Sequence, residues 1–227
     1  KYLNIAIIPA RKGSKRIKNK NRSLFHGKPL IYWTINAAKK TGIFRHIYVD
    51  TDCNKIKKLA LSYGAEVPFL RKKKFSSDFT SVNMSTYQFV KRIKKVHSID
   101  IKNIFQLMPN CPFRNYRDII KSYKKFVNLK SKSLISHVKF HFSNPWWAIK
   151  IKDGKTEKIF KRAYKKRSQD LPELITPSGA IWIVDCVNFM KKKSFYLDNY
   201  DFFLLDWKNG IDIDTVDEMK ISKSLKF

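Results

Sequence analysis

Short apolar runs alternate with amphipathic stretches through the first part of the chain, and this alternation is typical of an α/β protein. Residues 3–8 form a continuous apolar run that ends at Pro9, as in a parallel strand buried on both faces of a sheet. The pattern predicts strands at 3–8, 46–52, 66–70 and 103–108 and helices at 29–40, 55–63, 84–96 and 118–128. The order of these elements predicts a Rossmann-like, mainly parallel sheet flanked by helices.

The pattern changes from residue 133 onward, where short apolar runs are separated by polar turns. We interpret residues from about 133 to 178 as a small β-rich lobe inserted into a single domain that spans 1–227, and dimerisation is one use for such a lobe. The strands expected here are 133–138, 146–151, 159–160 and, after the lobe, 180–184, and a closing helix is expected at 217–225.

The composition fits a globular protein, since 43% of the 227 residues are hydrophobic and 14% are aromatic. No apolar run approaches the roughly 18 residues that cross a bilayer, and the stretch 5–8 is too short for a signal-peptide core. Cys53, Cys111 and Cys186 lie far apart without zinc-site spacing, which indicates reduced thiols. We therefore expect a soluble, cytoplasmic protein without a membrane partner.

The formal net charge of +30 admits three interpretations. Dense Lys and Arg are typical of nucleic-acid binding, because phosphate backbones attract positive charge. The same field would steer a polyanionic substrate toward an enzyme. The third interpretation is compositional drift toward Lys, Asn, Ile and Phe, which we favour because the lysines are scattered in pairs and triplets rather than gathered in one tail. Charge alone does not identify the function.

The loop after the first predicted strand, residues 10–21, is basic and lies where α/β folds bind ligands. Gly13 lets backbone N–H groups turn toward an anion. Arg11 can fork across phosphate oxygens, and Lys15 and Lys20 supply further positive charge. The loop matches neither GxxxxGK[ST] nor GxGxxG, so the residues alone leave a phosphate site and a solvated basic turn equally open.

Asp212 and Asp214 lie two residues apart, so in an extended segment their side chains point to the same side. Paired carboxylates can hold Mg²⁺, which prefers oxygen ligands and binds substrate phosphates. The alternative is a polar strand end that caps the final helix, with Asp217 and Glu218 in its first turn. From the residues alone, both interpretations stay open.

Several segments, taken in order, resemble the motifs of one family. They are residues 5–21 (with Ala10-Arg11-Lys12-Gly13-Ser14-Lys15 and Lys20-Asn21), 27–31, 49–52, 64–71, 109–114, 169–172, 179–181 and 211–215. Together they are similar to the acylneuraminate cytidylyltransferases, that is, the CMP-sialic acid synthetases and their legionaminic and pseudaminic acid relatives. The resemblance implies transfer of CMP from CTP to the anomeric hydroxyl of a sialic-acid-like nonulosonic acid, with release of pyrophosphate. It also implies Mg²⁺ as cofactor and a homodimer.

The resemblance assigns roles to particular residues. The catalytic residues that it implies are Arg11, Lys20, Asp212 and Asp214, of which the two aspartates bind the metal. Arg167 and Gln169 lie in the segment that in the family approaches the acidic sugar, often in the partner subunit's site. The nucleotide-binding residues that it implies are Ala10, Arg11, Gly13, Ser14, Lys15, Lys20, Asn21, Arg71, Ser81 and Pro109.

The chain also departs from the family pattern. Lys12 replaces the first Gly of the A-R-G-G-S-K motif, and Val82 replaces the second member of a small-residue pair. Met108 stands where a family Gln helps to hold the nucleotide, and Met cannot make the hydrogen bonds of Gln. Asn110 and Cys111 replace Thr and Ser. These departures leave the phosphate and metal chemistry intact but weaken the assignment of cytosine as the base.

Two alternatives therefore stay open. One is a related sugar nucleotidyltransferase that uses another nucleotide, for example GTP with an amino-sugar phosphate. The other, suggested by the charge, is a non-catalytic relative that binds nucleic acid, although a purely basic surface does not require an acidic pair. As partners we expect a nucleoside triphosphate and an acidic sugar, and no nucleic acid.

Overall fold

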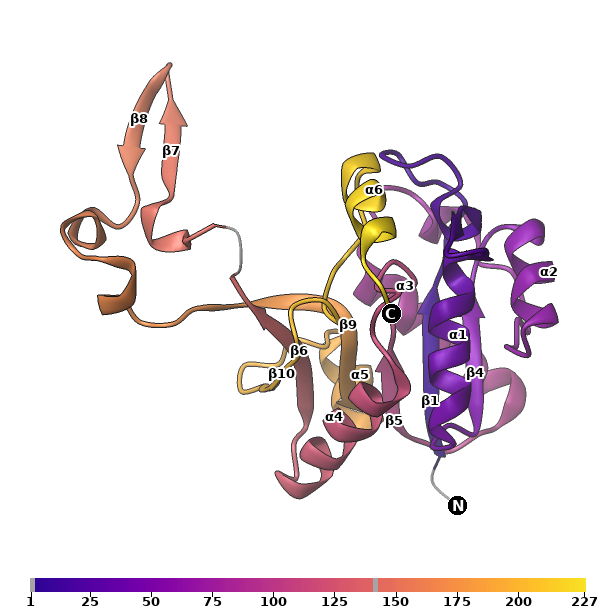
Figure 1. Cartoon of the computed structure of the whole chain (residues 1–227). Coiled ribbons are helices and arrows are strands. Elements are labelled where there is room, and N and C mark those ends of the chain that lie inside the picture. Colours follow the sequence, from indigo (N-terminus) through magenta and orange to yellow (C-terminus); the bar gives the residue numbers. More distant parts are fainter. Residues whose placement is uncertain (1–2, 141–142) are drawn as a thin grey trace.

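A computed structural model describes residues 3–140 and 143–227. Within them, a six-stranded sheet has the order β10-β6-β9-β5-β1-β4 (Figure 1). Its neighbours pair in parallel except at β9, which runs opposite to the other strands. The strands are β1 (Leu3–Pro9), β4 (His46–Asp50), β5 (Ile101–Gln106), β6 (Ser133–Lys139), β9 (Ile175–Asp185) and β10 (Asp201–Leu204). The predicted mainly parallel, Rossmann-like fold is confirmed.

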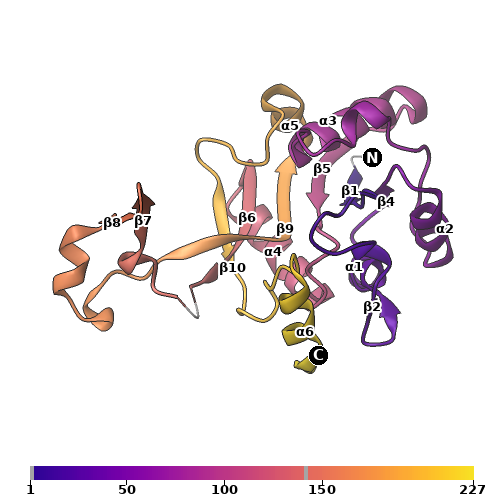
Figure 2. The same cartoon turned by 90° about the horizontal axis from the view of Figure 1, so that it is seen from above.

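Helices cover both faces of the sheet because successive strand side chains alternate between the faces. In β1, Ala6 and Ile8 join the core cluster that contains α1, α2 and α4, whereas Ile5 and Ile7 join the cluster that contains α3 and α5. Figure 2 shows α3 and α5 on one side of the sheet and α1 and α4 on the other. The helices are α1 (Leu30–Thr41), α2 (Asn54–Ser62), α3 (Val82–His97), α4 (Tyr116–Asn128), α5 (Cys186–Lys192) and α6 (Val216–Ser224).

The predicted strand at 66–70 is wrong. Glu66 alone makes a parallel bridge, to Tyr48 on the outer edge of β4. Pro68 follows two residues later and has no N–H to extend the ladder. The segment therefore leaves the sheet edge and continues as the loop that leads toward α3.

A hairpin arm, our name for residues 143–174, projects from the sheet between β6 and β9 (Figures 1 and 2). Its strands β7 (Ile149–Lys152) and β8 (Lys155–Lys158) pair antiparallel. The turn between them is Asp153-Gly154, with φ angles of 51 and 71°. Asp-Gly is a strong signal for such a turn, because both positions require positive φ.

The arm differs from the lobe expected at about 133–178. Residues 133–139 and 175–185 pair with each other as β6 and β9 of the main sheet, so the inserted part is narrower. The strand expected at 146–151 begins instead as a 3-10 helix, Pro145–Trp147, because the ring of Pro145 fixes a helical φ at its start. No strand forms at 159–160, which lies beyond the end of β8.

Within the part of the chain that the structure describes, no helix is long and apolar enough to cross a membrane. Cys53, Cys111 and Cys186 are buried and free, as expected for reduced thiols.

Candidate active site

A cleft of about 540 Å³ opens at the carboxyl ends of the parallel strands β1, β4 and β5. The loop after β1, the segment that leads into α3, the turn after β5 and the segment before α6 form its walls. The lining residues are Pro9, Arg11, Gly13, Ser14, Lys15, Arg16, Lys20, Asn21, Arg71, Ser77, Asp78, Thr80, Val82, Ser85, Met108, Pro109, Asn110, Asp212 and Asp214. This is the place where the strand order of an α/β fold predicts a ligand site.

Hydrogen bonds hold the loop after β1 in position. Asn21 Nδ2 donates to the carbonyl oxygen of Arg11 (3.2 Å), and the N–H of Lys12 donates to Asp52 Oδ1 (2.7 Å). Lys12 is not among the residues with positive φ. The side chain that replaces the family's Gly at this position therefore imposes no left-handed backbone strain.

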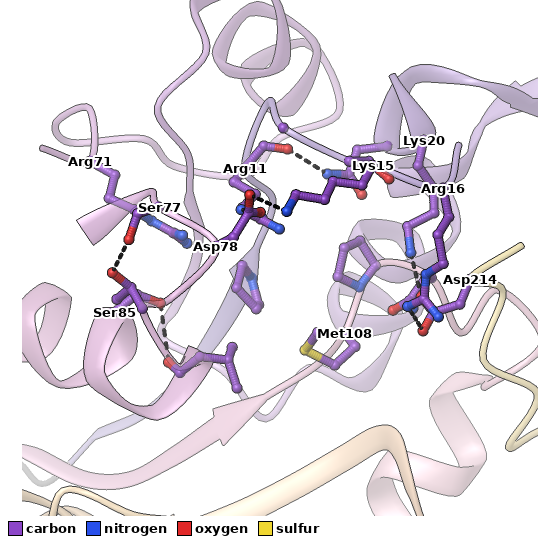
Figure 3. A pocket seen from close by; sticks show the side chains of 18 of the residues that line it. Arg11, Lys15, Arg16, Lys20, Arg71, Ser77, Asp78, Ser85, Met108 and Asp214 are labelled. Atoms are coloured by element: carbon purple, nitrogen blue, oxygen red, sulfur yellow. Dashed lines mark hydrogen bonds and ion pairs between the residues drawn. The ribbon is translucent and has the colours of Figure 1, made fainter. Parts of the chain in front are cut away.

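Two cations of this loop already contact a carboxylate from the facing wall. Arg11 Nη1 lies 2.6 Å from Asp78 Oδ1, and Lys15 Nζ lies 2.8 Å from Asp78 Oδ2 (Figure 3). The hydrogen bonds from Lys15 and Arg11 lower the pKa of Asp78 below its usual value. The two side chains are thus arranged to hold an anion, and phosphate oxygens would make the same contacts.

The opposite side of the cleft carries the paired aspartates. Lys20 Nζ donates to Asp214 Oδ1 (2.6 Å) and to the carbonyl of Ile213 (3.0 Å), and Arg16 Nη2 lies 2.5 Å from Asp214 Oδ2. Burial opposes ionisation of Asp214, but the hydrogen bond and charge of Lys20, together with Arg16, outweigh it and lower its pKa. Asp214 is therefore ionised at neutral pH.

Asp212 is more deeply buried than Asp214, and the nearby positive charge does not offset the cost of ionising it. Burial, and then the charge of Asp214, raise the pKa of Asp212 from 3.8 to about 6. Asn110 donates through Nδ2 to Oδ1 of both carboxylates, with a distance of 3.0 Å to that of Asp214. A Cβ on Gly179 would lie 3.2 Å from Asp212 Oδ2 and 3.1 Å from Met108 Cγ, so the backbone of β9 packs closely behind this carboxylate.

The donor set at this point suits Mg²⁺. Two close carboxylates repel each other, and a divalent cation would relieve that repulsion. Among the described residues, no group of three or more His, Cys, Asp or Glu side chains forms a metal site. A Mg²⁺ held by Asp212 and Asp214 would complete its coordination with water and substrate phosphates, as this ion commonly does.

Arg71 lies on the remaining wall and is tied to the end of β4. Its Nη2 is 2.7 Å from Asp50 Oδ2 and donates to the carbonyl of Asp50 (3.0 Å). Burial raises the pKa of Asp50, although the charge of Arg71 acts in the opposite direction. Arg71 lines the cleft, and its Nε is buried without a hydrogen-bond partner among the described residues.

Four of the predicted site residues do not line the cleft. Ala10 is buried in the core, and Ser81 caps α3 by accepting a backbone N–H. Arg167 and Gln169 lie on the hairpin arm, where Arg167 pairs with Asp170. The predicted residues that the fold does bring together in the cleft are Arg11, Gly13, Ser14, Lys15, Lys20, Asn21, Arg71, Pro109, Asp212 and Asp214.

Other cleft residues were not predicted. They are Pro9, Arg16, Ser77, Asp78, Thr80 and Ser85, together with Val82, Met108 and Asn110, which the sequence showed only as departures from the family pattern. Arg16 belongs to the same basic loop and could have been included as a further cation. The serines, the threonine and Asp78 lie in or next to a polar segment without a motif, so the sequence offered no signal for them.

Comparison with known proteins identifies the family. A family model described as Cytidylyltransferase matches residues 5–139. The chain belongs to this family. The pseudaminic acid cytidylyltransferase of Campylobacter jejuni serotype O:2 is 31% identical over 223 residues, which cover 98% of this chain and 95% of that protein. The N-acylneuraminate cytidylyltransferase of Escherichia coli O18:K1:H7 is 30% identical over 211 residues, which cover 92% of this chain and 49% of that protein. The predicted resemblance is confirmed.

Solved structures support the fold of this cytidylyltransferase. The CTP complex of CMP:2-keto-3-deoxy-manno-octonic acid synthetase aligns over 98% of this chain and 97% of that chain, with a TM-score of 0.71 and 13% identity. The 4-diphosphocytidyl-2C-methyl-D-erythritol synthase of Anaerococcus prevotii aligns with a TM-score of 0.66 and 13% identity, over 98% of this chain and 97% of that chain. The family is one of nucleotidyltransferase enzymes, and none of these matches supports a module that only binds nucleic acid.

Proposed function

We propose that this cytidylyltransferase transfers CMP from CTP to the anomeric hydroxyl of a nonulosonic acid and releases pyrophosphate. The observation that carries the proposal is one cleft that joins the cations of the loop after β1 to Asp212 and Asp214. The names of the similar proteins, which act on pseudaminic and N-acylneuraminic acids, support an acidic sugar as the acceptor.

Basic side chains of the cleft would bind the triphosphate. Arg11 and Lys15 would exchange the Asp78 carboxylate for phosphate oxygens, while Lys20 would hold the phosphate chain beside the acidic pair. Mg²⁺ at Asp212 and Asp214 would neutralise charge on the triphosphate and lower the cost of ionising the sugar hydroxyl. The remaining requirement is orientation, so that the hydroxyl lies in line with the bond to the leaving pyrophosphate.

Asp214 provides the test of this chemistry. Asp214→Ala is expected to abolish pyrophosphate release from CTP and a nonulosonic acid while the circular dichroism spectrum stays unchanged, because it removes the carboxylate held by Lys20 and Arg16. Asp206→Ala, at an exposed position outside the cleft, is the matched control and should keep wild-type activity. Normal pyrophosphate release by the Asp214 variant would contradict the metal assignment.

Met108 bears on the choice of base. It lines the cleft in place of a family Gln, and Gln106 does not substitute for it, because Gln106 is fully buried and does not line the cleft. A nucleotidyltransferase that uses GTP is therefore the second candidate. Thermal shifts with CTP, GTP, UTP and ATP, each with Mg²⁺, discriminate between them. We expect stabilisation by CTP. Stabilisation by GTP but not by CTP would make the GTP-using enzyme the first candidate.

The hairpin arm supports a homodimer in which each chain completes the other's sugar site. The arm that bears Arg167 and Gln169 projects away from the six-stranded sheet in both views (Figures 1 and 2), and neither residue lines the cleft of its own chain. The arm also exposes apolar side chains, with Ile151 78% and Trp147 43% exposed, as a surface meant for a partner would. We propose that the guanidinium of Arg167 binds the sugar carboxylate in the partner subunit's cleft.

Mixing two inactive variants tests this arrangement. In a mixed dimer the lesions of Asp214→Ala and Arg167→Ala fall in the same site and leave the other site intact, so an equal mixture with free subunit exchange should recover about a quarter of the wild-type activity. Lys20→Met mixed with Asp214→Ala is the control, since both lesions lie in the cleft of their own chain and leave no complete site. A monomer by light scattering, or no recovery in the first mixture, would refute the shared site without refuting the transferase.

A further inference from the structure

Asn110 is tied to the acidic pair by its side chain and by its backbone. It lies in the turn after β5 and is only 5% exposed. Its Nδ2 donates to Oδ1 of Asp212 and to Oδ1 of Asp214, and its carbonyl accepts the N–H of Ile213 (2.9 Å). One N–H donor group thus bridges two carboxylates and occupies the point where their negative charges converge.

The other end of the same amide has no partner. Asn110 Oδ1 is buried, and no described residue donates a hydrogen bond to it, although the residue lines the cleft. Leaving a buried amide oxygen unpartnered is unfavourable, and a bound ion is one of the partners that can satisfy such an atom. Amide oxygens, like carboxylate oxygens, are ligands that Mg²⁺ accepts.

We propose that Asn110 is a third oxygen ligand of the divalent cation at Asp212 and Asp214, and that its side-chain amide turns over when the cation binds. Without the cation, the N–H end satisfies both carboxylates. A half-turn about the Cβ–Cγ bond exchanges Nδ2 for Oδ1 without changing the shape of the side chain. The oxygen would then gain the cation as a partner, and Nδ2 would move from the two carboxylates to the position that Oδ1 occupies without the cation. The inference rests on the proposed function, which assigns the cation to the two aspartates.

A ligand role and a purely positioning role predict different behaviour of two variants. Asn110→Leu keeps the branched shape but removes both the donor and the oxygen, so it weakens cation binding in either case. Asn110→Asp presents an oxygen in either orientation and adds negative charge, which strengthens binding if residue 110 is a ligand. If Asn110 only positions the aspartates, the loss of its donor in Asn110→Asp offsets the added negative charge, and cation affinity stays close to that of the wild type.

The measurement is Mn²⁺ binding to the nucleotide-free full chain, followed by electron paramagnetic resonance with Mg²⁺ as competitor. We expect Mn²⁺ affinity to fall about tenfold in Asn110→Leu and to rise about tenfold in Asn110→Asp. Asn188 provides the matched control, since its Nδ2 also donates to a carboxylate, that of Asp185 (2.6 Å), outside the cleft. Asn188→Leu and Asn188→Asp should leave Mn²⁺ affinity unchanged.

Two results would overturn the inference. Wild-type Mn²⁺ affinity in a folded Asn110→Leu variant, or affinity in Asn110→Asp no higher than that of the wild type, would remove Asn110 from the ligands and leave the two-aspartate site in place. Failure of the wild type itself to bind Mn²⁺ better than Asp214→Ala would refute the proposed metal site, and this inference with it. Should Asn110→Leu fail to fold, the Asp variant still decides the question.

Discussion

Replacing Asp212 by Asn removes a buried charge that folding places beside Asp214. The pKa of Asp212 is about 6 in the folded protein, against an ordinary value of 3.8, because burial and the charge of Asp214 disfavour the ionised form. The side chain is protonated in both folded and unfolded states below about pH 4 and ionised in both well above about pH 6. Stability is therefore lost as the pH rises through this window, and the loss is complete at neutral pH.

The magnitude follows from the difference between the two pKa values. About two pKa units, at about 1.36 kcal/mol each, correspond to about 3 kcal/mol. Asn carries no charge at any pH, so Asp212→Asn should avoid this cost while it abolishes CMP transfer. In a chain of this length, each kcal/mol of stability shifts the melting temperature by about 2–4 °C. The variant should therefore melt roughly 6–12 °C higher than the wild type at pH 7.5.

The assay is thermal and denaturant unfolding of both proteins between pH 4 and pH 8 in the absence of divalent cations. The difference in free energy of unfolding between Asp212→Asn and the wild type should grow between about pH 4 and pH 6 and then stay constant. Asp198→Asn is the matched control, because its side chain is 94% exposed and its loss removes one negative charge without relieving burial. A variant less stable than the wild type at pH 7.5, or a gap of equal size at pH 4.5 and pH 7.5, would refute the reasoning.

Two further predictions concern the phosphate side of the cleft and the packing beneath the site. Asp78→Asn should tighten nucleoside triphosphate binding severalfold in calorimetry, because the carboxylate no longer competes with phosphate for Arg11 and Lys15. Unchanged or weaker binding would show that Asp78 does not occupy the phosphate position. Gly210→Ala should lower the free energy of unfolding by about 1–3 kcal/mol in a denaturant titration, because the new Cβ would overlap Cγ1 of β-branched Val138. A loss below about 0.5 kcal/mol would mean that the side chains around residue 210 repack freely.

The part of the fold that positions the site could be predicted from the sequence. The strands β1, β4 and β5 are short, largely buried segments that alternate with helical patterns along the chain, and their carboxyl ends locate the cleft. Lys20 and Asp214 are 194 residues apart in sequence yet in contact. Only the resemblance to family motifs joined them, because no local pattern records a contact over that distance.

Features that depend on tertiary context could not be predicted in the same way. The helix α5 has only seven residues, and edge strand β10 has four, so neither gives a readable period. The bridging of Arg11 and Lys15 by Asp78 arises from the placement of a polar loop, which leaves no pattern in the sequence. The extent of the arm depended on whether residues 133–139 pair within the main sheet or outside it, and the alternation of side chains is the same in both cases.

The central claim is that a sugar hydroxyl attacks the α-phosphate of CTP in this cleft. The most direct test is mass spectrometry of the products formed from CTP, Mg²⁺ and a panel of nonulosonic acids whose anomeric hydroxyl carries ¹⁸O. We predict a CMP-sugar that retains the label in the new phosphoester, together with unlabelled pyrophosphate, and no such product from Asp214→Ala. Absence of any CMP-sugar across the panel, or a nucleotide–sugar formed from GTP and not from CTP, would contradict the claim.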